Sequence, residues 1–144
     1  IAIVGCGRIA KNHFASIKKH QDNLELVALC DENKEILEQH QEQHNVPGYQ
    51  ELSSMLKAET IDIIALCTPS GLHADQTVIA AGFGVNVMTE KPMATRWQDG
   101  VRMVKACDNA GVYLFVVKQN RRNSTLQLLK RAVEEKRFGK INMV

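Results

Sequence analysis

The sequence predicts an α/β protein built as a doubly wound parallel sheet, and three observations support this prediction. Short apolar segments of strand length alternate along the chain with longer segments of helical periodicity. A GxGxxA pattern stands directly after the first apolar segment, between a predicted strand and a predicted helix. Later apolar segments are followed by proline, small polar or charged residues, as strands are where ligands bind at the edge of an open α/β sheet.

Length and charge exclude several classes of protein. The 144 residues suffice for one domain with its own core. A net charge of +2, without basic runs interleaved with aromatic residues, argues against a nucleic-acid partner. The apolar segments are too short to cross a bilayer, so we expect neither a membrane partner nor a signal segment.

The cysteines and the two chain ends add two expectations. Cys6, Cys30, Cys67 and Cys107 show no CxxC spacing, so we expect reduced, buried thiols in a cytoplasmic protein and no metal site. The chain begins within one apolar segment and ends within another. We therefore expect it to be the N-terminal domain of a longer chain.

The first strand and helix carry the phosphate-binding pattern. Ile1 to Val4 is the apolar segment, and the GxGxxA residues Gly5 to Ala10 follow it. Gly5 allows a tight turn, Gly7 lets the backbone approach a pyrophosphate, and the small Ala10 lets the helix pack close to the strand. The helix N-terminus then offers free N–H groups to the phosphates.

An acidic residue follows the second predicted strand, Leu24 to Cys30. Asp31 stands 21 residues after Ala10, the spacing expected of a carboxylate that accepts hydrogen bonds from the adenosine ribose. No arginine stands beside it, and its followers are Glu32, Asn33 and Lys34. A 2′-phosphate would meet negative charge here, so NAD is favoured over NADP. The alternative is that Asp31 only caps the next helix.

The segment that follows Asp31 is polar. Glu32 to His44 predicts an outer helix covered by solvent. His40 and His44 share a face at i, i+4 and could bind a metal, but without a third ligand we expect solvated side chains. Tyr49 predicts a vestigial third strand, and Glu51 to Lys57 a short helix.

The next strand ends in another polar loop. Ile61 to Cys67 is apolar, and Thr68, Pro69 and Ser70 follow it. His73 stands at the start of a helix of small residues, where a structural hydrogen bond is expected more than a role as a base.

A lysine follows the fifth predicted strand, Val85 to Met88. In Glu90-Lys91-Pro92, Lys91 stands at the carboxyl end of a strand and is fixed by a following proline, where open α/β sheets bind their ligands. The alternative is an exposed lysine in a loop. Thr95 to Gln98 predicts a capping box for the next helix, with an apolar stripe of Trp97, Val101, Val104 and Cys107.

The sixth strand, Tyr113 to Val117, leads into a basic segment. Arg121 and Arg122 suit a planar anion such as a carboxylate or diphosphate, or they are simply exposed. A last amphipathic helix follows, with Leu126, Leu129, Lys130 and Val133 on its face. We assign residues 1–123 to the dinucleotide-binding domain, and residues 124–144 to a connecting helix and the start of a second, substrate and oligomerisation domain.

These motifs in this order resemble the Gfo/Idh/MocA family of oxidoreductases, named for glucose-fructose oxidoreductase and inositol dehydrogenase. The resemblance rests on Gly5 to Ala10, Asp31, Thr68-Pro69 with His73, and Glu90-Lys91-Pro92. It implies a Rossmann fold that binds NAD, with Lys91 beside the nicotinamide and the reacting sugar carbon. The contacts then implied with the cofactor are those of Gly5, Gly7, Arg8, Ile9, Asp31, Thr68, Pro69, Ser70, His73, Glu90 and Asn120.

More narrowly, Glu90 to Trp97 and Lys118 to Asn123 resemble the subgroup that oxidises UDP-N-acetylglucosaminuronic acid at C3. This implies a sugar or nucleotide-sugar substrate, a place in lipopolysaccharide sugar synthesis, and an NAD-dependent homotetramer. The family also uses an Asp and a His on a later helix, which this chain does not include. We therefore expect residues 1–144 to bind NAD without turnover.

Other classes remain open. An NAD-binding module or sensor without turnover would carry the same residues from Gly5 to Asp31, and a family member could act on another sugar or a cyclitol. A methyltransferase also places an acid after its second strand. Against it, Lys91 has no evident task in methyl transfer, whereas oxidation of an alcohol needs a proton acceptor in addition to NAD.

Overall fold

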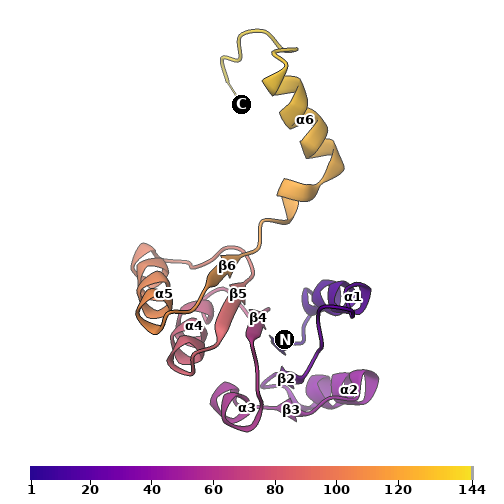
Figure 1. Ribbon diagram of the computed structural model, residues 1–144, viewed down its shortest axis with the longest axis vertical. Helices are drawn as coiled ribbons and strands as arrows, with labels where there is room; N and C mark the ends of the chain where they lie inside the picture. The colour runs from indigo at the N-terminus through magenta and orange to yellow at the C-terminus, as the bar shows by residue number, and fades with distance from the viewer. Residues whose placement is uncertain (144) are drawn as a thin grey trace.

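Six short parallel strands form one sheet in the computed structural model, which describes residues 1–143. The strand order is β3-β2-β1-β4-β5-β6 (Figure 1), so the chain winds outward in one direction from β1 and in the other from β4. The predicted doubly wound sheet is confirmed. The strands are β1 (Ala2–Val4), β2 (Ala28–Cys30), β3 (Gly48–Tyr49), β4 (Ile63–Leu66), β5 (Asn86–Thr89) and β6 (Leu114–Val116).

Helices connect the strands in the predicted order, although most strands are shorter than the apolar segments that predicted them. Leu24 to Cys30, for example, contributes only its last three residues to β2. The vestigial third strand at Tyr49 is present. The helices are α1 (Ala10–Lys19), α2 (Lys34–His44), α3 (Leu52–Ala58), α4 (His73–Gly82), α5 (Trp97–Ala110) and α6 (Ser124–Glu134), with the 3₁₀ helix η1 at Gln119–Arg122.

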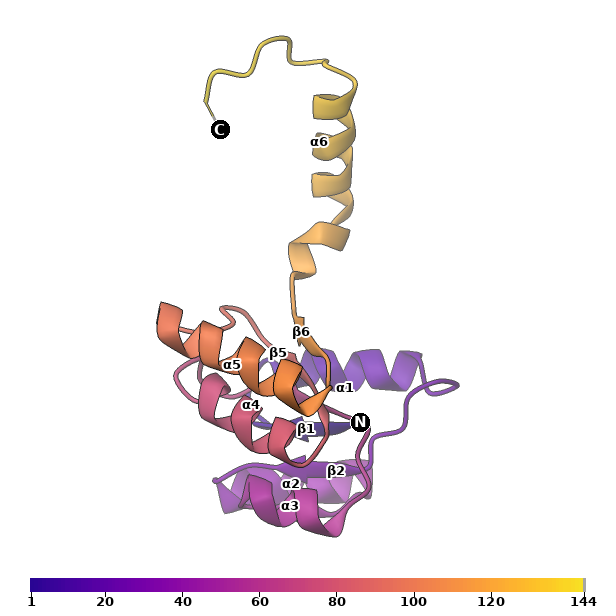
Figure 2. The same cartoon turned by 60° about the vertical axis from the view of Figure 1, so that its left-hand side comes forward.

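Both faces of the sheet carry helices (Figures 1 and 2): α1 and α2 lie on one, and α3, α4 and α5 on the other. The alternation along β1 shows why its residues are all apolar. Ile3 packs with Phe14 and Ile17 of α1, whereas its neighbours Ala2 and Val4 face the other core. A parallel strand covered on both faces must be apolar at every position, which explains the continuous apolar segments.

The prediction that His40 and His44 are solvated is wrong. His40 is buried, and its ring stacks on Phe14 of α1 with centroids 5.0 Å apart. His44 stacks on the same phenyl ring at 4.2 Å, and burial, together with the nearby His40, lowers the pKa of His44. Both histidines therefore belong to the contact between α1 and α2. Within residues 1–143, no group of three or more candidate ligands is placed to hold a metal ion.

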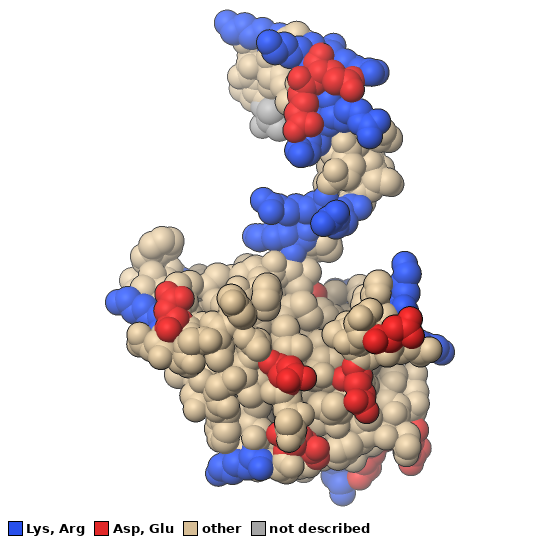
Figure 3. All heavy atoms as spheres, in the orientation of Figure 1, with Lys and Arg blue, Asp and Glu red and all other residues tan. Residues whose placement is uncertain are grey.

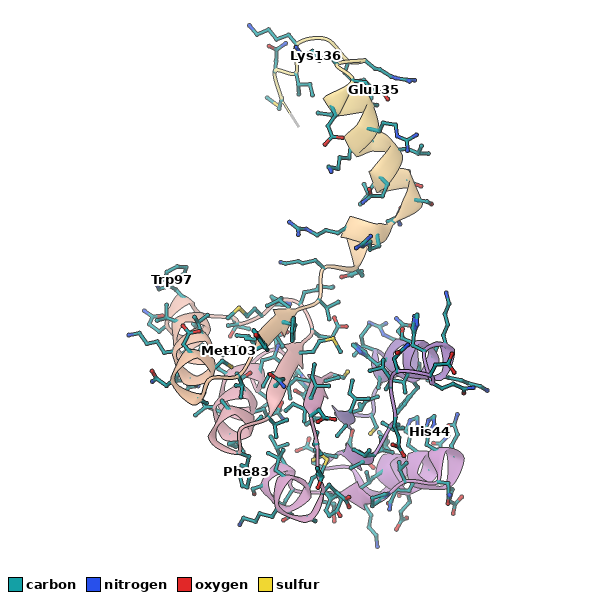
Figure 4. The ribbon with its side chains drawn as sticks, viewed as in Figure 1. His44, Phe83, Trp97, Met103, Glu135 and Lys136 are labelled. Carbon is teal, nitrogen blue, oxygen red and sulfur yellow. The ribbon has the colours of Figure 1, made fainter. Side chains whose placement is uncertain are left out.

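The capping box predicted for α5 is wrong, and of the predicted apolar stripe only Cys107 is buried. The helix begins at Trp97, and Arg96 occupies the N-cap position without a side-chain cap. Its buried residues are Met103 and Cys107, whereas Trp97 is 83% exposed and Val104 is 44% exposed. Figure 4 shows Trp97 projecting away from the sheet and Met103 on the inner side of the helix. The helix packs against α4 and β6, and that contact selects the buried face.

The last helix stands away from the sheet (Figures 1 and 2), joined to it by the segment that follows β6. The apolar face predicted for this helix has no partner among residues 1–143: Leu126, Leu129 and Val133 are exposed. Lys and Arg side chains gather along this outer part of the chain (Figure 3). No helix within the described residues is both long enough and apolar enough to span a bilayer.

Candidate functional site

The predicted site residues that follow β1, β2, β4 and β5 lie at one edge of the sheet, because these strands are parallel. The loop after β1 lies between the ends of β2 and β4: the Gly5 N–H donates to the Cys30 carbonyl at 2.7 Å, and the Cys67 N–H donates to the Val4 carbonyl at 2.7 Å. The Glu90 N–H likewise donates to the Leu66 carbonyl at 3.0 Å. The two windings of the sheet separate here, between β1 and β4, where such folds bind dinucleotides.

The two glycines of the first loop have different environments. Gly5 has a φ of 88°, and a Cβ atom added there would lie 2.8 Å from the backbone nitrogen of Thr68. Glycine is therefore required by the protein's own backbone. A Cβ on Gly7 would meet no atom within 4 Å, so its side of the loop is open to a ligand.

The amide groups next to Gly7 are suited to bind phosphate. Within residues 1–143, the backbone N–H groups of Gly7, Arg8 and Ile9 have no hydrogen-bond acceptor, and α1 starts immediately after them at Ala10. Free amides and the positive end of a helix dipole favour an anion. The open side of Gly7 and these amides fit the pyrophosphate of a dinucleotide.

Asp31 is held rigidly at the end of β2. Its Oδ2 accepts the Cys6 N–H at 2.7 Å, and its Oδ1 accepts the Asn33 N–H at 2.8 Å. The alternative that Asp31 caps the next helix is wrong, because the side chain of Asn33 caps α2 by accepting from the amides of Glu35 and Ile36. A carboxylate oxygen can accept further hydrogen bonds, so Asp31 fits the hydroxyls of a ribose beside the first loop.

His73 joins the loops after β4 and β5. The side chain is 1% exposed, with Nδ1 3.1 Å from the carbonyl oxygen of Pro92 and Nε2 2.9 Å from that of Thr68. A neutral imidazole can donate only one of these hydrogen bonds. His73 thus has the structural hydrogen bonding expected of it, and its contact with the cofactor stays a prediction.

Glu90 is buried between its own loop and α1. Its Oε1 lies 2.8 Å from Nε2 of His13, and its Oε2 accepts the Lys91 N–H at 3.2 Å. The sequence reasoning missed His13. The available signal was its position four residues before Ile17, which places it on the face of α1 that is turned toward the sheet.

Lys91 follows Glu90 at the carboxyl end of β5, in the predicted position, and its side chain is exposed among residues 1–143. Asn120, Arg121 and Arg122 are also exposed, in η1, on the segment that leads away from the sheet. The structure therefore brings Lys91 into the same edge as the phosphate loop and Asp31. It does not bring the two arginines there.

The four cysteines are free and buried, as predicted. Burial raises the pKa of Cys6 to about 12, and the nearby Asp31 carboxylate adds to the shift. The pKa values of Cys30 and Cys67 are raised to about 12 for the same main reason, with Asp31 and Glu90 as their respective charged neighbours. Thiols of such high pKa are poor nucleophiles, so the cysteines are structural.

A cleft of about 1270 Å³ lies between α1 and α2. The first loop forms part of its wall through Cys6, Gly7 and Arg8, and His40 lines it as well. Thr68, Glu90 and Lys91 do not line this cleft.

Comparison with known proteins gives a family match over most of the chain. Residues 1–118 match GFO_IDH_MocA, described as an oxidoreductase family with an NAD-binding Rossmann fold. Among solved structures, the chain is similar to the WlbA dehydrogenase from Bordetella pertussis in complex with NADH and UDP-GlcNAcA, at 55% identity and a TM-score of 0.92. That match covers 97% of this chain and 43% of the WlbA chain.

Two further relatives extend the comparison. The WlbA dehydrogenase from Chromobacterium violaceum, also in complex with NADH and UDP-GlcNAcA, is 56% identical with a TM-score of 0.91, covering 97% of this chain and 41% of that one. The D-apiose dehydrogenase of Paraburkholderia graminis is 32% identical over 96% of this chain and 37% of that protein. The chain thus spans about two fifths of the length of these relatives.

Proposed function

The chain belongs to the GFO_IDH_MocA oxidoreductase family and has its NAD-binding Rossmann fold, and on this basis we propose that it is the cofactor domain of an NAD-dependent sugar dehydrogenase. The proposed substrate is UDP-N-acetylglucosaminuronic acid, oxidised at C3 during lipopolysaccharide sugar synthesis. The identity of 55% and 56% to two dehydrogenases whose structures hold NADH and UDP-GlcNAcA supports this choice of substrate.

One structural observation carries the proposal. The phosphate loop at Gly5 and Gly7, the ribose acceptor Asp31, and Lys91 follow β1, β2 and β5 of one parallel sheet, and so lie along the same edge. A dinucleotide extended along that edge from Asp31 would have its adenosine end at β2 and its nicotinamide end toward β5. Lys91 is then an exposed charged side chain directly after β5, at the proposed nicotinamide end.

The chemistry assigns each residue a task. NAD, when bound, supplies the hydride acceptor. Oxidation of a secondary alcohol also requires a group that takes the hydroxyl proton, and Lys91 stands where it can act on that hydroxyl. A lysine takes a proton only as the neutral amine, a form that exclusion of water by bound cofactor and substrate favours. The other possible task for Lys91 is to stay charged and polarise the oxygen while a histidine outside residues 1–144 takes the proton.

The remaining site assignments are part of the same proposal. Glu90 and the Thr68-Pro69 loop contact the nicotinamide side of the cofactor. The phosphates and the ribose are held by Gly5, Gly7, Arg8, Ile9 and Asp31, and the further cofactor contacts are Ser70, His73 and Asn120. Arg121 and Arg122 are proposed to bind the acidic substrate. Their exposed guanidinium groups and the cluster of basic residues in Figure 3 support an anionic ligand.

We propose the corresponding organisation of the whole protein. Residues 1–123 are the dinucleotide-binding domain, and residues 124–144 lead into a substrate and oligomerisation domain of a tetramer. The exposed apolar side chains of α6, including Leu128 at 63% exposed, support a partner surface for this helix. A cytoplasmic location is proposed as well, supported by four buried free thiols.

The test is turnover by the purified full-length protein, followed as NADH formation. UDP-N-acetylglucosaminuronic acid is compared with UDP-N-acetylglucosamine, which lacks the carboxylate, with UDP-glucuronic acid, and with myo-inositol and D-apiose. We expect turnover of the first compound above all others. Faster oxidation of inositol or apiose would instead identify a family member for another sugar or cyclitol, and NADH binding without any turnover would identify a sensor.

The same assay on residues 1–144 tests the division into domains. We expect this fragment to bind NADH and to show no turnover, because the second catalytic group and the substrate wall are proposed to lie beyond it. Oxidation of the nucleotide sugar by the fragment would contradict that division.

A further inference from the structure

We propose that His13 is a positioning residue for Lys91 and acts through the carboxylate of Glu90. This inference rests on the proposed function, since it concerns the lysine assigned to the reacting hydroxyl. His13 lies in α1, far from Lys91 in sequence, and its side chain is not a candidate to touch the substrate because Glu90 already occupies its Nε2.

The first step is the contact itself. His13 Nε2 lies 2.8 Å from Glu90 Oε1, with side chains 12% and 10% exposed. An ionised carboxylate only accepts, so Nε2 must carry the hydrogen. A hydrogen bond to a carboxylate is stronger than one between neutral groups, and shielding from water strengthens it further.

The second step leads from Glu90 to the lysine. The other carboxylate oxygen, Oε2, accepts the backbone N–H of Lys91 at 3.2 Å. The carboxylate therefore bridges the imidazole of α1 and the backbone from which the lysine side chain projects. With His13 holding one oxygen, rotation of the Glu90 side chain is restricted, and the Lys91 backbone keeps its acceptor.

The third step concerns the support of His13. Its neighbour in sequence, Phe14, and Ile17 one turn later are buried in the core, so α1 is fixed against the sheet. The same helix begins at the phosphate loop. The proposed pyrophosphate site and the loop of Lys91 are thus tied to one rigid element, which sets the distance between the two ends of the cofactor and the reacting hydroxyl.

The variants separate positioning from packing. His13→Gln keeps an N–H donor close to the position of Nε2, whereas His13→Leu keeps bulk and removes the donor. His20→Leu is the matched control, because His20 is exposed at the end of the same helix. All variants are made in the full-length protein.

Hydrogen–deuterium exchange without cofactor gives a readout that does not depend on activity. We expect the amide of Lys91 to exchange faster in His13→Leu than in the wild type, and at the wild-type rate in His13→Gln and His20→Leu. Pro92 has no N–H, so two peptides with the same start that end at Glu90 and at Pro92 differ only in the amide of Lys91.

Kinetics with NAD and the nucleotide sugar give the second readout. We expect His13→Leu to lower kcat by about 10- to 100-fold, the loss typical of a displaced catalytic group. The KM for NAD should change little, and His13→Gln should restore most of kcat. Combining His13→Leu with Glu90→Gln should add little to the larger single effect, because both changes break the same bridge.

The inference is overturned if His13→Leu shows the same Lys91 exchange rate and the same kcat as the wild type. It is also overturned if His13→Gln and His13→Leu lose kcat equally and lose thermal stability in parallel, because the effect is then one of packing. Failure of the proposed function looks different. In that case the wild-type protein does not oxidise the sugar, and the exchange rates alone decide whether His13 holds the Lys91 backbone through Glu90.

Discussion

Gly5 and Thr68 approach each other so closely that a Cβ atom on the glycine would lie 2.8 Å from the backbone nitrogen of Thr68. The contact joins the turn after β1 to the loop after β4, at the point where the sheet's two windings separate. Neither backbone can move without shifting the end of its strand. Gly5 is therefore a requirement of the fold as well as of the proposed cofactor site.

The first prediction compares the two glycines of this loop. Gly5→Ala forces a Cβ into that contact at a φ of 88°, and it should lower the free energy of unfolding by about 1–3 kcal/mol. Gly7→Ala meets no protein atom, so it should change that free energy by less than about 0.5 kcal/mol but weaken NADH binding. Urea denaturation and NADH titration measure the two effects. Unchanged NADH affinity in Gly7→Ala would remove Gly7 from the phosphate site.

The second prediction concerns the choice between NAD and NADP. No arginine stands beside Asp31, and the nearby Lys34 pairs with Glu38, so the carboxylate should repel a 2′-phosphate. We expect NAD to bind at least about tenfold more tightly than NADP, a difference of about 1.4 kcal/mol. Asp31→Asn should narrow this ratio, and Glu32→Gln is the matched control. Calorimetric titration with both cofactors measures the ratio of the two affinities. Tighter binding of NADP by the wild type would contradict the assignment of Asp31 to the ribose.

The third prediction tests Lys91 in the full-length protein. Lys91→Ala should lower kcat by roughly 10² to 10⁴, the range for loss of a general acid or base. NADH affinity should change little, because Asp31 and the phosphate loop lie at other strands of the sheet edge. Lys91→Met repeats the test with the aliphatic stem preserved. A normal kcat with only a raised KM would reassign Lys91 to substrate binding.

The fourth prediction follows from the buried thiols. The pKa of Cys67 is about 12 in the folded chain and close to 9 when the thiol is free, so unfolding releases its proton between these values. The neutral thiol makes its full contribution to the free energy of unfolding below pH 9, and this contribution is lost as the pH rises toward 12. The free energy of unfolding should therefore fall over this range under reducing conditions. The difference between the wild type and Cys67→Ala should shrink over the same range, and a constant difference would contradict the buried, neutral state.

Local patterns were sufficient for the order of the elements and for the residues at the strand ends. The family, the Rossmann fold and the NAD cofactor predicted from those patterns are confirmed by the match over residues 1–118. The reason is physical: a buried parallel strand must be apolar throughout, and the phosphate loop needs glycine at a fixed place after it. Both requirements are visible within a few residues of sequence.

Features that depend on distant contacts were missed. The His13–Glu90 pair joins residues 77 positions apart, and neither residue type signals the other. The burial of His40 depends on a phenyl ring from another helix, and hydrophobic periodicity treats a histidine as polar. The exposed position of Trp97 reflects which side of α5 meets α4, which the composition of the helix alone does not determine.

Asp31 and Asn33 have different tasks at the end of β2, and this difference affects how the cofactor preference of the protein could change. Asn33 alone provides the side-chain cap of α2, so the start of that helix does not require a carboxylate two residues earlier. Asp31 does accept the N–H groups of Cys6 and Asn33, so its replacement should keep a side-chain oxygen. Asn at position 31 with a basic residue at position 32 would meet this condition and leave the Asn33 cap in place. Cofactor preference in this domain is in that sense a separable trait, able to drift while the fold is conserved.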